Sequence, residues 1–79
     1  MDTTNLDKEI GARVAGARDK NGATNAGLAE GTGIPRTTLI RSLNGDRPFR
    51  VSELPRLGNV LGVPYAEFLT APHPDPVPA

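Results

Sequence analysis

The chain has 79 residues, no cysteine, and nine basic against nine acidic side chains. A chain of this length forms one small domain that buries only about 60% of its unfolded surface, which excludes a large cavity-bearing enzyme. Without cysteine it can build neither a disulfide framework nor a thiolate metal site, and this fits a reducing cytoplasm. The first 30 residues contain no long apolar run, so we expect no signal peptide and no membrane span.

The charge is unevenly distributed along the chain. Residues 33–56 hold five arginines and two acidic residues, so this segment carries a net charge of +3 and the remainder −3. The arginines are Arg36, Arg41, Arg47, Arg50 and Arg56. A positive patch on a neutral protein can steer it toward phosphate, although more weakly than a uniformly basic domain would.

The first predicted element is a helix over about residues 5–20. Leu6, Ile10, Val14 and Ala17 recur at intervals of four, four and three residues, which is the stripe of an amphipathic helix.

Two glycines interrupt this helix, and each costs roughly 1 kcal/mol relative to alanine. Gly11 and Gly16 either let a neighbouring helix approach closely or reflect composition alone, and the sequence favours the second explanation. Asn21 and Gly22 form a turn signal that ends the helix.

Residues 24–45 are predicted to form two short helices joined by a glycine turn. Thr24 and Asn25 can cap the first helix, which ends near Thr32. Gly33 can adopt the left-handed conformation that helix C-termini often require.

The second of these helices begins at Pro35, where the missing N–H group costs nothing. It is predicted to run to about Asn44 and to end at Gly45. Leu39 and Leu43 are four residues apart and face inward. The outward arc carries Arg36, Thr37, Ile40, Arg41 and Asn44.

The landmarks of this segment follow a known pattern. They are the Leu28-Ala29 pair, Gly33 at the turn, apolar Ile34 after it, Leu39, and Asn44-Gly45 at the end. With these residues the segment resembles the helix-turn-helix of the phage Cro and repressor family, also called the XRE type, and the likeness continues through residues 46–69. Thr32 and Ser42 depart from it, because the family usually places apolar residues there, and they predict a thinner core.

A loop over residues 46–50 follows, with Phe49 as its apolar peg. Ser52 is then expected to cap a fourth helix, in which Pro55 still lies within the first turn. Its buried face comprises Leu54, Leu57 and Leu61, with Val51 and Val60 adjoining. Gly62 ends it.

A short fifth helix starts after Val63 and Pro64 and runs through Leu69, with Tyr65 and Phe68 closing the core. The segment 71–79 holds four prolines, which favour an extended, disordered tail. We therefore predict an all-α, compact five-helix domain over residues 1–70, similar to lambda repressor, followed by this tail.

The resemblance implies binding to double-stranded DNA, with the third helix in the major groove. A guanidinium there can donate two hydrogen bonds to guanine O6 and N7, which makes Arg36 and Arg41 candidates for reading bases. Alternatively, both arginines are solvated or pair with Glu30. Thr37 can contact a base edge or a phosphate, and Ile40 either packs on a thymine methyl group or is half-buried.

Phosphate contacts are expected to flank this helix. Asn25 begins the second helix, where free backbone N–H groups can hold a phosphate, and Asn44, Arg47 and Arg50 follow the third helix. Alternatively, Asn44 caps its own helix and the loop arginines face solvent. The complete predicted DNA-binding set is Asn25, Pro35, Arg36, Thr37, Thr38, Ile40, Arg41, Asn44, Arg47 and Arg50.

Catalytic chemistry has little support. His73 is the only histidine and lies in the tail, and Ser42 and Ser52 have no base beside them, so we expect no enzyme, no metal and no cofactor. The predicted function is a cytoplasmic transcriptional regulator of phage or bacterial origin. The alternative is a protein-interaction module on the same fold, such as an antitoxin or a subunit that modulates another regulator.

Self-association is expected to be weak. Nearly all apolar residues are needed for one small core, which leaves at most a patch around Val63, Tyr65 and Leu69. We therefore expect a monomer, or a weak homodimer that pairs on DNA.

Overall fold

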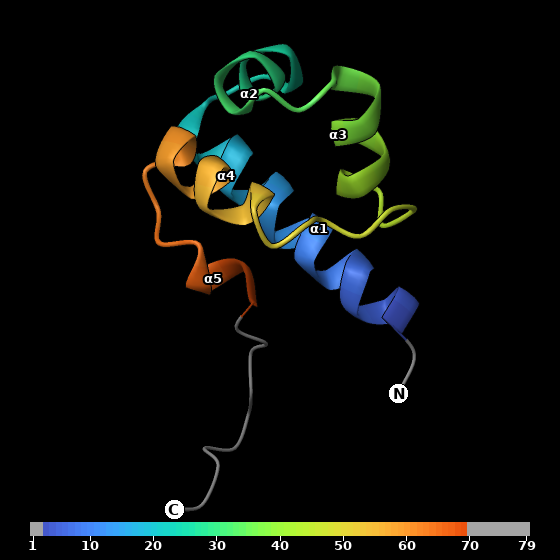
Figure 1. Cartoon of the computed structure of the whole chain (residues 1–79). Helices are drawn as coiled ribbons and strands as arrows, with labels where there is room; N and C mark the ends of the chain where they lie inside the picture. The colour runs from blue at the N-terminus through green and yellow to red at the C-terminus, as the bar shows by residue number, and fades with distance from the viewer. Residues whose placement is uncertain (1–2, 70–79) are drawn as a thin grey trace, which may run out of the picture.

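The computed structural model describes residues 3–69, and every regular element within that range is an α-helix. The five helices are α1 (Thr3–Asn21), α2 (Asn25–Thr32), α3 (Arg36–Leu43), α4 (Glu53–Leu61) and α5 (Ala66–Leu69). Figure 1 shows α2 and α3 at one end of the molecule, the long α1 running diagonally past the others, and α5 at the opposite end from α2. The predicted all-α, five-helix fold is confirmed, whereas the proline-rich segment 71–79 lies outside the described residues.

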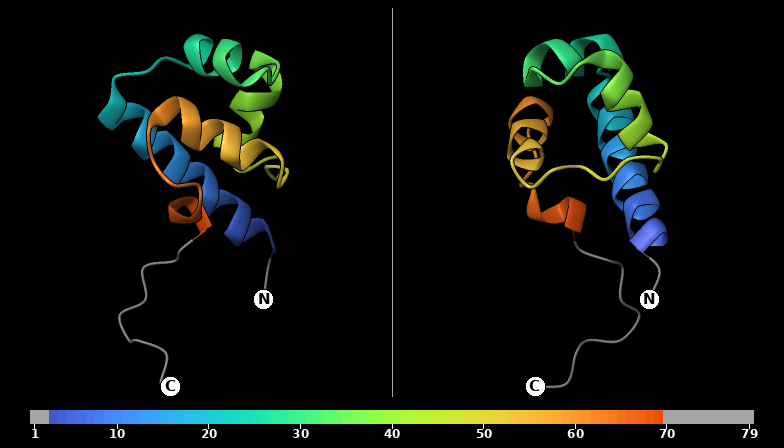
Figure 2. Two further views of the ribbon diagram at one scale, coloured as in Figure 1. Left: turned by 60° about the vertical axis from the view of Figure 1, so that its left-hand side comes forward. Right: turned by 45° about the vertical axis from the view of Figure 1, so that its right-hand side comes forward.

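The helix α1 is the support on which the domain is built. It packs against α3, α4 and α5, while α2 packs against both α3 and α4. The right-hand view in Figure 2 shows α3 at one side of α1 and α4 at the other. Because α1 and α2 hold one side of α3, the other side of this helix is left to solvent.

The core draws at least one buried apolar residue from every helix. Its members are Ile10, Val14, Leu28, Ile34, Leu39, Leu54, Leu57, Leu61 and Phe68. Burying one such side chain contributes about 1.5–3 kcal/mol. The apolar stripe predicted for α1 is confirmed at Ile10 and Val14, but Leu6 is 43% exposed because no other helix reaches far enough to cover the first turn.

Two glycines of α1 have different surroundings. A Cβ atom on Gly11 would lie 2.5 Å from the carbonyl oxygen of Leu43 and 2.7 Å from that of Ser42, so the backbones of α1 and α3 touch here. A Cβ atom on Gly16 would meet nothing within 4 Å. The close-approach explanation, which the sequence did not favour, is therefore right for Gly11 and wrong for Gly16.

The start of α4 differs from the prediction. Ser52 has helical backbone angles and its side chain makes no capping hydrogen bond. Instead the carboxylate of Glu53 accepts the backbone N–H of Arg50 at 2.8 Å. This turn leaves Val51 82% exposed, so its expected place beside the core is wrong. At α5 the prediction is half right, since Phe68 is buried but Tyr65 is 46% exposed.

Three side chains close helix C-termini from a distance. Arg13 donates to the carbonyl of Phe68 at 3.0 Å, and Asn21 donates to that of Leu61 at 3.2 Å. Arg56 donates to the carbonyl of Thr32 at 3.5 Å, at the end of α2. The last carbonyls of a helix lack partners within it, so each bond satisfies a group that the helix leaves open.

Candidate nucleic-acid interface

The turn between α2 and α3 follows the predicted chemistry. Thr24 has an extended backbone, and its hydroxyl oxygen accepts the N–H of Gly27 at 3.0 Å, so Thr24 is the cap and Asn25 the first helical residue. Gly33 ends α2 with a φ angle of 78° and donates its N–H to the carbonyl of Ala29 at 2.9 Å. A positive φ angle is unfavourable for side chains other than glycine, which explains the residue at this turn.

The helix α3 is one residue shorter at each end than predicted. Pro35 lies just before it, and its carbonyl accepts the N–H of Leu39 at 2.9 Å. Asn44 closes the helix, and Gly45 leaves it with a φ angle of 82°. The alternative that Asn44 caps its own helix is thus observed for its backbone N–H, and the residue is exposed.

The two residues that depart from the usual apolar pattern are buried and hydrogen-bonded. The Thr32 hydroxyl donates to the carbonyl of Leu28 at 2.6 Å and accepts the N–H of Ile34 at 3.3 Å. Ser42 is fully buried, and its hydroxyl oxygen accepts a hydrogen bond from Arg47 at 2.8 Å. Because a buried polar group without a partner costs about 1–3 kcal/mol, these bonds are what make the two hydroxyls tolerable inside the core.

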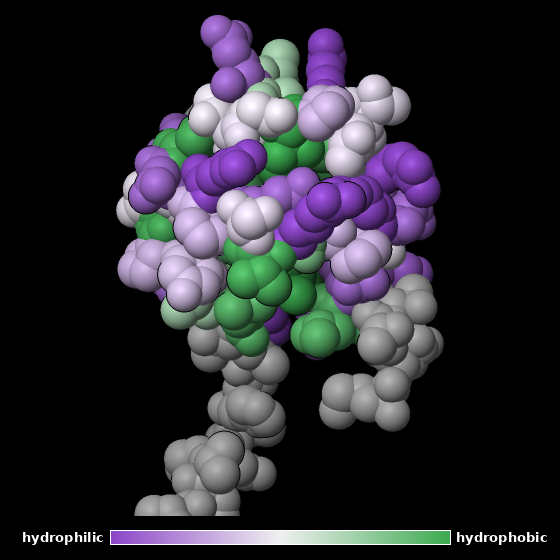
Figure 3. Space-filling model, in the orientation of Figure 1, coloured by the Kyte–Doolittle hydropathy of each residue, from purple (hydrophilic) through white to green (hydrophobic). Residues whose placement is uncertain are grey.

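The solvent-facing side of α3 is the candidate interface. Arg36, Thr37 and Arg41 are exposed, while Thr38 and Ile40 are half-buried. Within residues 3–69, neither guanidinium of α3 pairs with an acidic side chain, so the alternative of a pairing with Glu30 is not observed. In Figure 3 hydrophilic side chains are prominent around the end that carries α2 and α3, and hydrophobic ones gather lower on the same face.

Helix geometry gives the order of the side chains around the solvent-facing side of α3. At about 100° per residue, Arg36 and Arg41 are separated by about 140° around the axis and by about 7.5 Å along it. Thr37 and Ile40 lie between them on that arc. The two arginines therefore flank the face that α3 presents to solvent, and the smaller side chains form its centre.

Asn25 is held by a residue that the sequence did not single out for this interface. Arg18 donates from Nη1 to the Asn25 side-chain oxygen at 2.7 Å, and it also pairs with Asp19 at 3.0 Å. These bonds place a guanidinium beside the N-terminus of α2. The sequence shows that the end of α1 is basic. It does not show that the chain turns so tightly after α1 that Arg18 reaches the start of α2.

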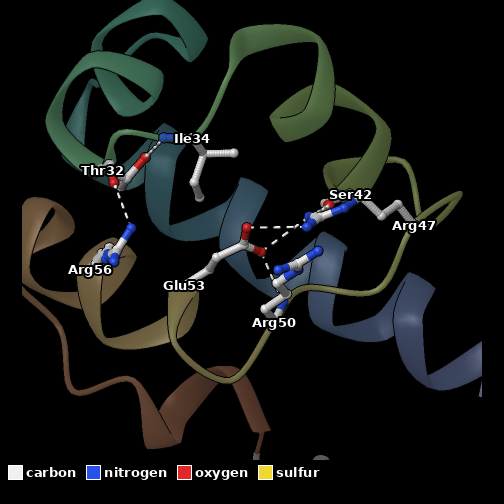
Figure 4. Close-up of polar contacts among 7 residues, drawn as sticks. All are labelled: Thr32, Ile34, Ser42, Arg47, Arg50, Glu53 and Arg56. Atoms are coloured by element: carbon white, nitrogen blue, oxygen red, sulfur yellow. Dashed lines mark hydrogen bonds and ion pairs between the residues drawn. The ribbon is translucent and has the colours of Figure 1, made fainter.

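The two arginines of the loop before α4 differ. The guanidinium of Arg47 donates to Ser42 and, through two nitrogens, to both carboxylate oxygens of Glu53 at 3.1 Å each, as Figure 4 shows. Its side chain is only 19% exposed, so this geometry disfavours the expected phosphate contact by Arg47. Arg50 is exposed, and its backbone N–H donates to the carboxylate of Glu53.

Glu53 is a buried carboxylate that stays ionised. Burial by itself would raise its pKa, but the hydrogen bonds from the Arg47 side chain and the Arg50 backbone outweigh that effect. The positive charges of the same two arginines act in the same direction, and the pKa of Glu53 is lowered from its usual value of 4.5.

Residues 3–69 were also compared with the requirements of a membrane span and of a metal site. No helix in this range is both long and apolar enough to cross a membrane. The same residues contain no group of three or more side chains able to hold a metal ion together.

The fold and this exposed helix define a class. Five packed helices, with α2 and α3 joined by a glycine turn and α3 open to solvent, are the architecture of a helix-turn-helix DNA-binding domain. The family model described as "Helix-turn-helix domain" matches residues 9–70 of the chain. The chain therefore belongs to this family. No match was found among curated proteins.

Proposed function

We propose that the protein is a sequence-specific transcriptional regulator of the Cro or repressor type that binds double-stranded DNA and has no enzymatic activity. The observation that carries this proposal is the exposed face of α3, on which Arg36 and Arg41 pair with no acidic side chain of residues 3–69. The major groove is about 12 Å wide, and an α-helix with its side chains is about 10–12 Å across. In this proposal α3 is the recognition helix and lies in that groove.

The DNA contact proposed for each residue of the recognition helix follows from its position around the helix axis. Arg36 and Arg41 flank the face and donate to base edges, with guanine as the best partner because it offers two acceptors. Thr37 and Ile40 lie at the centre, where the Thr37 hydroxyl contacts a base edge. Ile40 is half-buried, and the exposed part of its side chain packs on a thymine methyl group. Asn44 lies within the same face at the end of α3, and Pro35 and Thr38 border it.

Phosphate contacts come from both sides of the recognition helix. At one side, Asn25 and the free N–H groups at the start of α2 face one phosphate, with Arg18 adding positive charge. At the other side, Arg50 lies in the loop that follows α3. These contacts fix the protein's register on the duplex but do not read its sequence. Repression would follow from occupying a promoter or operator.

The test is a selection from random duplexes at fixed salt, followed by Arg36→Ala and Arg41→Ala. Each substitution should cost about 1–3 kcal/mol at the preferred duplex and relax discrimination at one base pair. The matched control is Lys20→Ala, an exposed cation on α1 outside the α2–α3 unit, which should leave discrimination unchanged. If both arginine variants weakened binding to all sequences equally, base reading by α3 would be wrong.

The competing function is a protein-interaction module on the same fold. The large apolar side chains that are exposed in residues 3–69 are Leu6, Val51, Tyr65 and Leu69. None of them lies on α3, whose exposed residues are polar or basic. This distribution favours DNA, and salt-dependent binding to mixed duplex DNA separates the two functions, because an interaction module need not show it.

A further inference from the structure

A polar network inside the domain ties α3 to α4. Ser42 is the inward-facing hydroxyl of α3, and it accepts from Nη1 of Arg47 at 2.8 Å. The same nitrogen donates to Oε1 of Glu53, and Nη2 donates to Oε2, both at 3.1 Å. Glu53 is the first residue of α4 and also accepts the backbone N–H of Arg50. Figure 4 shows these groups converging between the end of α3 and the start of α4.

We infer that Arg47 is a positioning residue for base recognition, because it fixes α3 to α4 through Ser42 and Glu53 and so sets where the outward side chains of α3 lie. This inference rests on the proposed function. Arg47 touches no base in this account. It acts through α3, whose exposed side carries Arg36 and Arg41.

The packing of α3 explains why such a link matters. This helix has only eight residues, its start has no side-chain cap, and its main packing partners are α1 and α2. A bidentate contact between an arginine and a guanine depends on direction as well as distance, so a small rotation of α3 would misalign both arginines of its exposed face.

A gain in folding stability does not by itself explain the network of Ser42, Arg47 and Glu53. Burying two charges costs desolvation free energy, and replacing a buried ion pair by apolar side chains is often neutral or stabilising. What the pair provides is geometry, since a planar guanidinium can serve a hydroxyl and both oxygens of one carboxylate at once. A lysine ammonium is a point charge on a flexible stem and cannot hold the same three acceptors in a fixed plane.

The experiment compares Ser42→Ala and Arg47→Lys with the parent protein. Each is titrated with the parent's selected duplex and with a scrambled duplex, below the temperature at which thermal unfolding begins. The readout is the dissociation constant for the scrambled duplex divided by that for the selected duplex. Both variants should lower this ratio about tenfold by weakening the selected complex, while binding to the scrambled duplex stays within about twofold. Ser42→Ala leaves the ion pair in place, so folding is retained.

Thr32→Ala is the matched control, because it also removes a buried hydroxyl of the helix-turn-helix, one whose bonds stay within residues 28–34. It should lower the melting temperature and leave the ratio unchanged. If Ser42→Ala and Arg47→Lys behaved like this control, the network would be merely structural and the inference would be overturned. A parent protein that selects no duplex would instead refute the proposed function, and the inference with it.

Discussion

Arg47 and Arg50 lie three residues apart in one loop and both act on Glu53, yet their side chains differ in burial. Arg47 is bonded on several sides within the domain, whereas Arg50 is exposed. Their sequence context does not distinguish them, because both are arginines beside an apolar or proline residue in a basic segment. Only the position of Glu53, folded back over the loop, decides which guanidinium is available for phosphate.

This difference yields a prediction for Arg50. Its replacement by alanine should weaken binding to every duplex by a similar factor and lower the slope of log affinity against log salt by roughly one unit. The measurement is a set of titrations at several salt concentrations, with Lys20→Ala as the control. An unchanged slope in Arg50→Ala would move the phosphate contact elsewhere.

The lowered pKa of Glu53 leads to a second prediction, which concerns the pH dependence of stability. Its pKa in the folded state is lowered, so its contribution to stability is complete above its usual pKa of 4.5 and is lost as the pH falls below that value through the folded pKa. The parent should lose stability over this range more steeply than Glu53→Gln, whose amide does not titrate.

Urea unfolding of both proteins between pH 7 and pH 3 measures this effect. The difference in the free energy of unfolding should be largest at neutral pH and shrink on acidification. Because the two proteins differ only at residue 53, the difference between their curves isolates the contribution of this side chain. Two curves that stayed parallel would show that Glu53 is not stabilised as an anion in the folded state.

Among the elements, α1 and α3 are joined where their backbones touch. A new Cβ atom at Gly11 would meet backbone oxygens, which cannot move aside as a flexible side chain can. We therefore expect Gly11→Ala to destabilise the protein by about 1–3 kcal/mol. Gly16→Ala is the matched substitution in the same helix, and it should stabilise by up to about 1 kcal/mol because its surroundings are open.

Urea denaturation of the two alanine variants tests this pair. Similar changes in both would mean that helix propensity alone governs these positions and that the contact of α1 with α3 is looser than described.

The sequence was informative about elements wherever a local rule operates. Thr24, Gly33 and Gly62 mark helix ends through their own backbone or side-chain chemistry, and the structure confirms each of them. Ser52 failed as a cap because its backbone is already helical, whereas a capping residue has a non-helical backbone, and because Pro55 offers no N–H for it to accept. The contact at Gly11 and the bond from Arg18 to Asn25 depend on how helices meet in space, which no local pattern encodes. The predicted DNA contacts themselves stay predictions.

For the whole molecule, the exposed apolar residues bear on association. Tyr65 and Leu69 are each about half exposed on or beside α5, and Val63 is half-buried next to them. One such small patch is well below the roughly 800 Å² per partner that stable interfaces bury. We expect a monomer, or a homodimer weaker than micromolar, with two copies pairing on neighbouring half-sites about 34 Å apart.

Sedimentation of the free protein at tens of micromolar measures the oligomeric state. A single species with the mass of one chain is expected. A stoichiometric dimer would mean that part of the assigned core is an interface between two copies.

The bonds from Arg13, Asn21 and Arg56 to distant carbonyls have a consequence for how the domain loses its structure. They join residues that are 55, 40 and 24 positions apart in the chain. A helix of four residues such as α5 cannot persist by itself in water. Arg13 and Phe68 connect it to α1, the helix at the other end of the described chain. The first and last helices therefore form one cooperative unit, and release of either would expose the core that both cover.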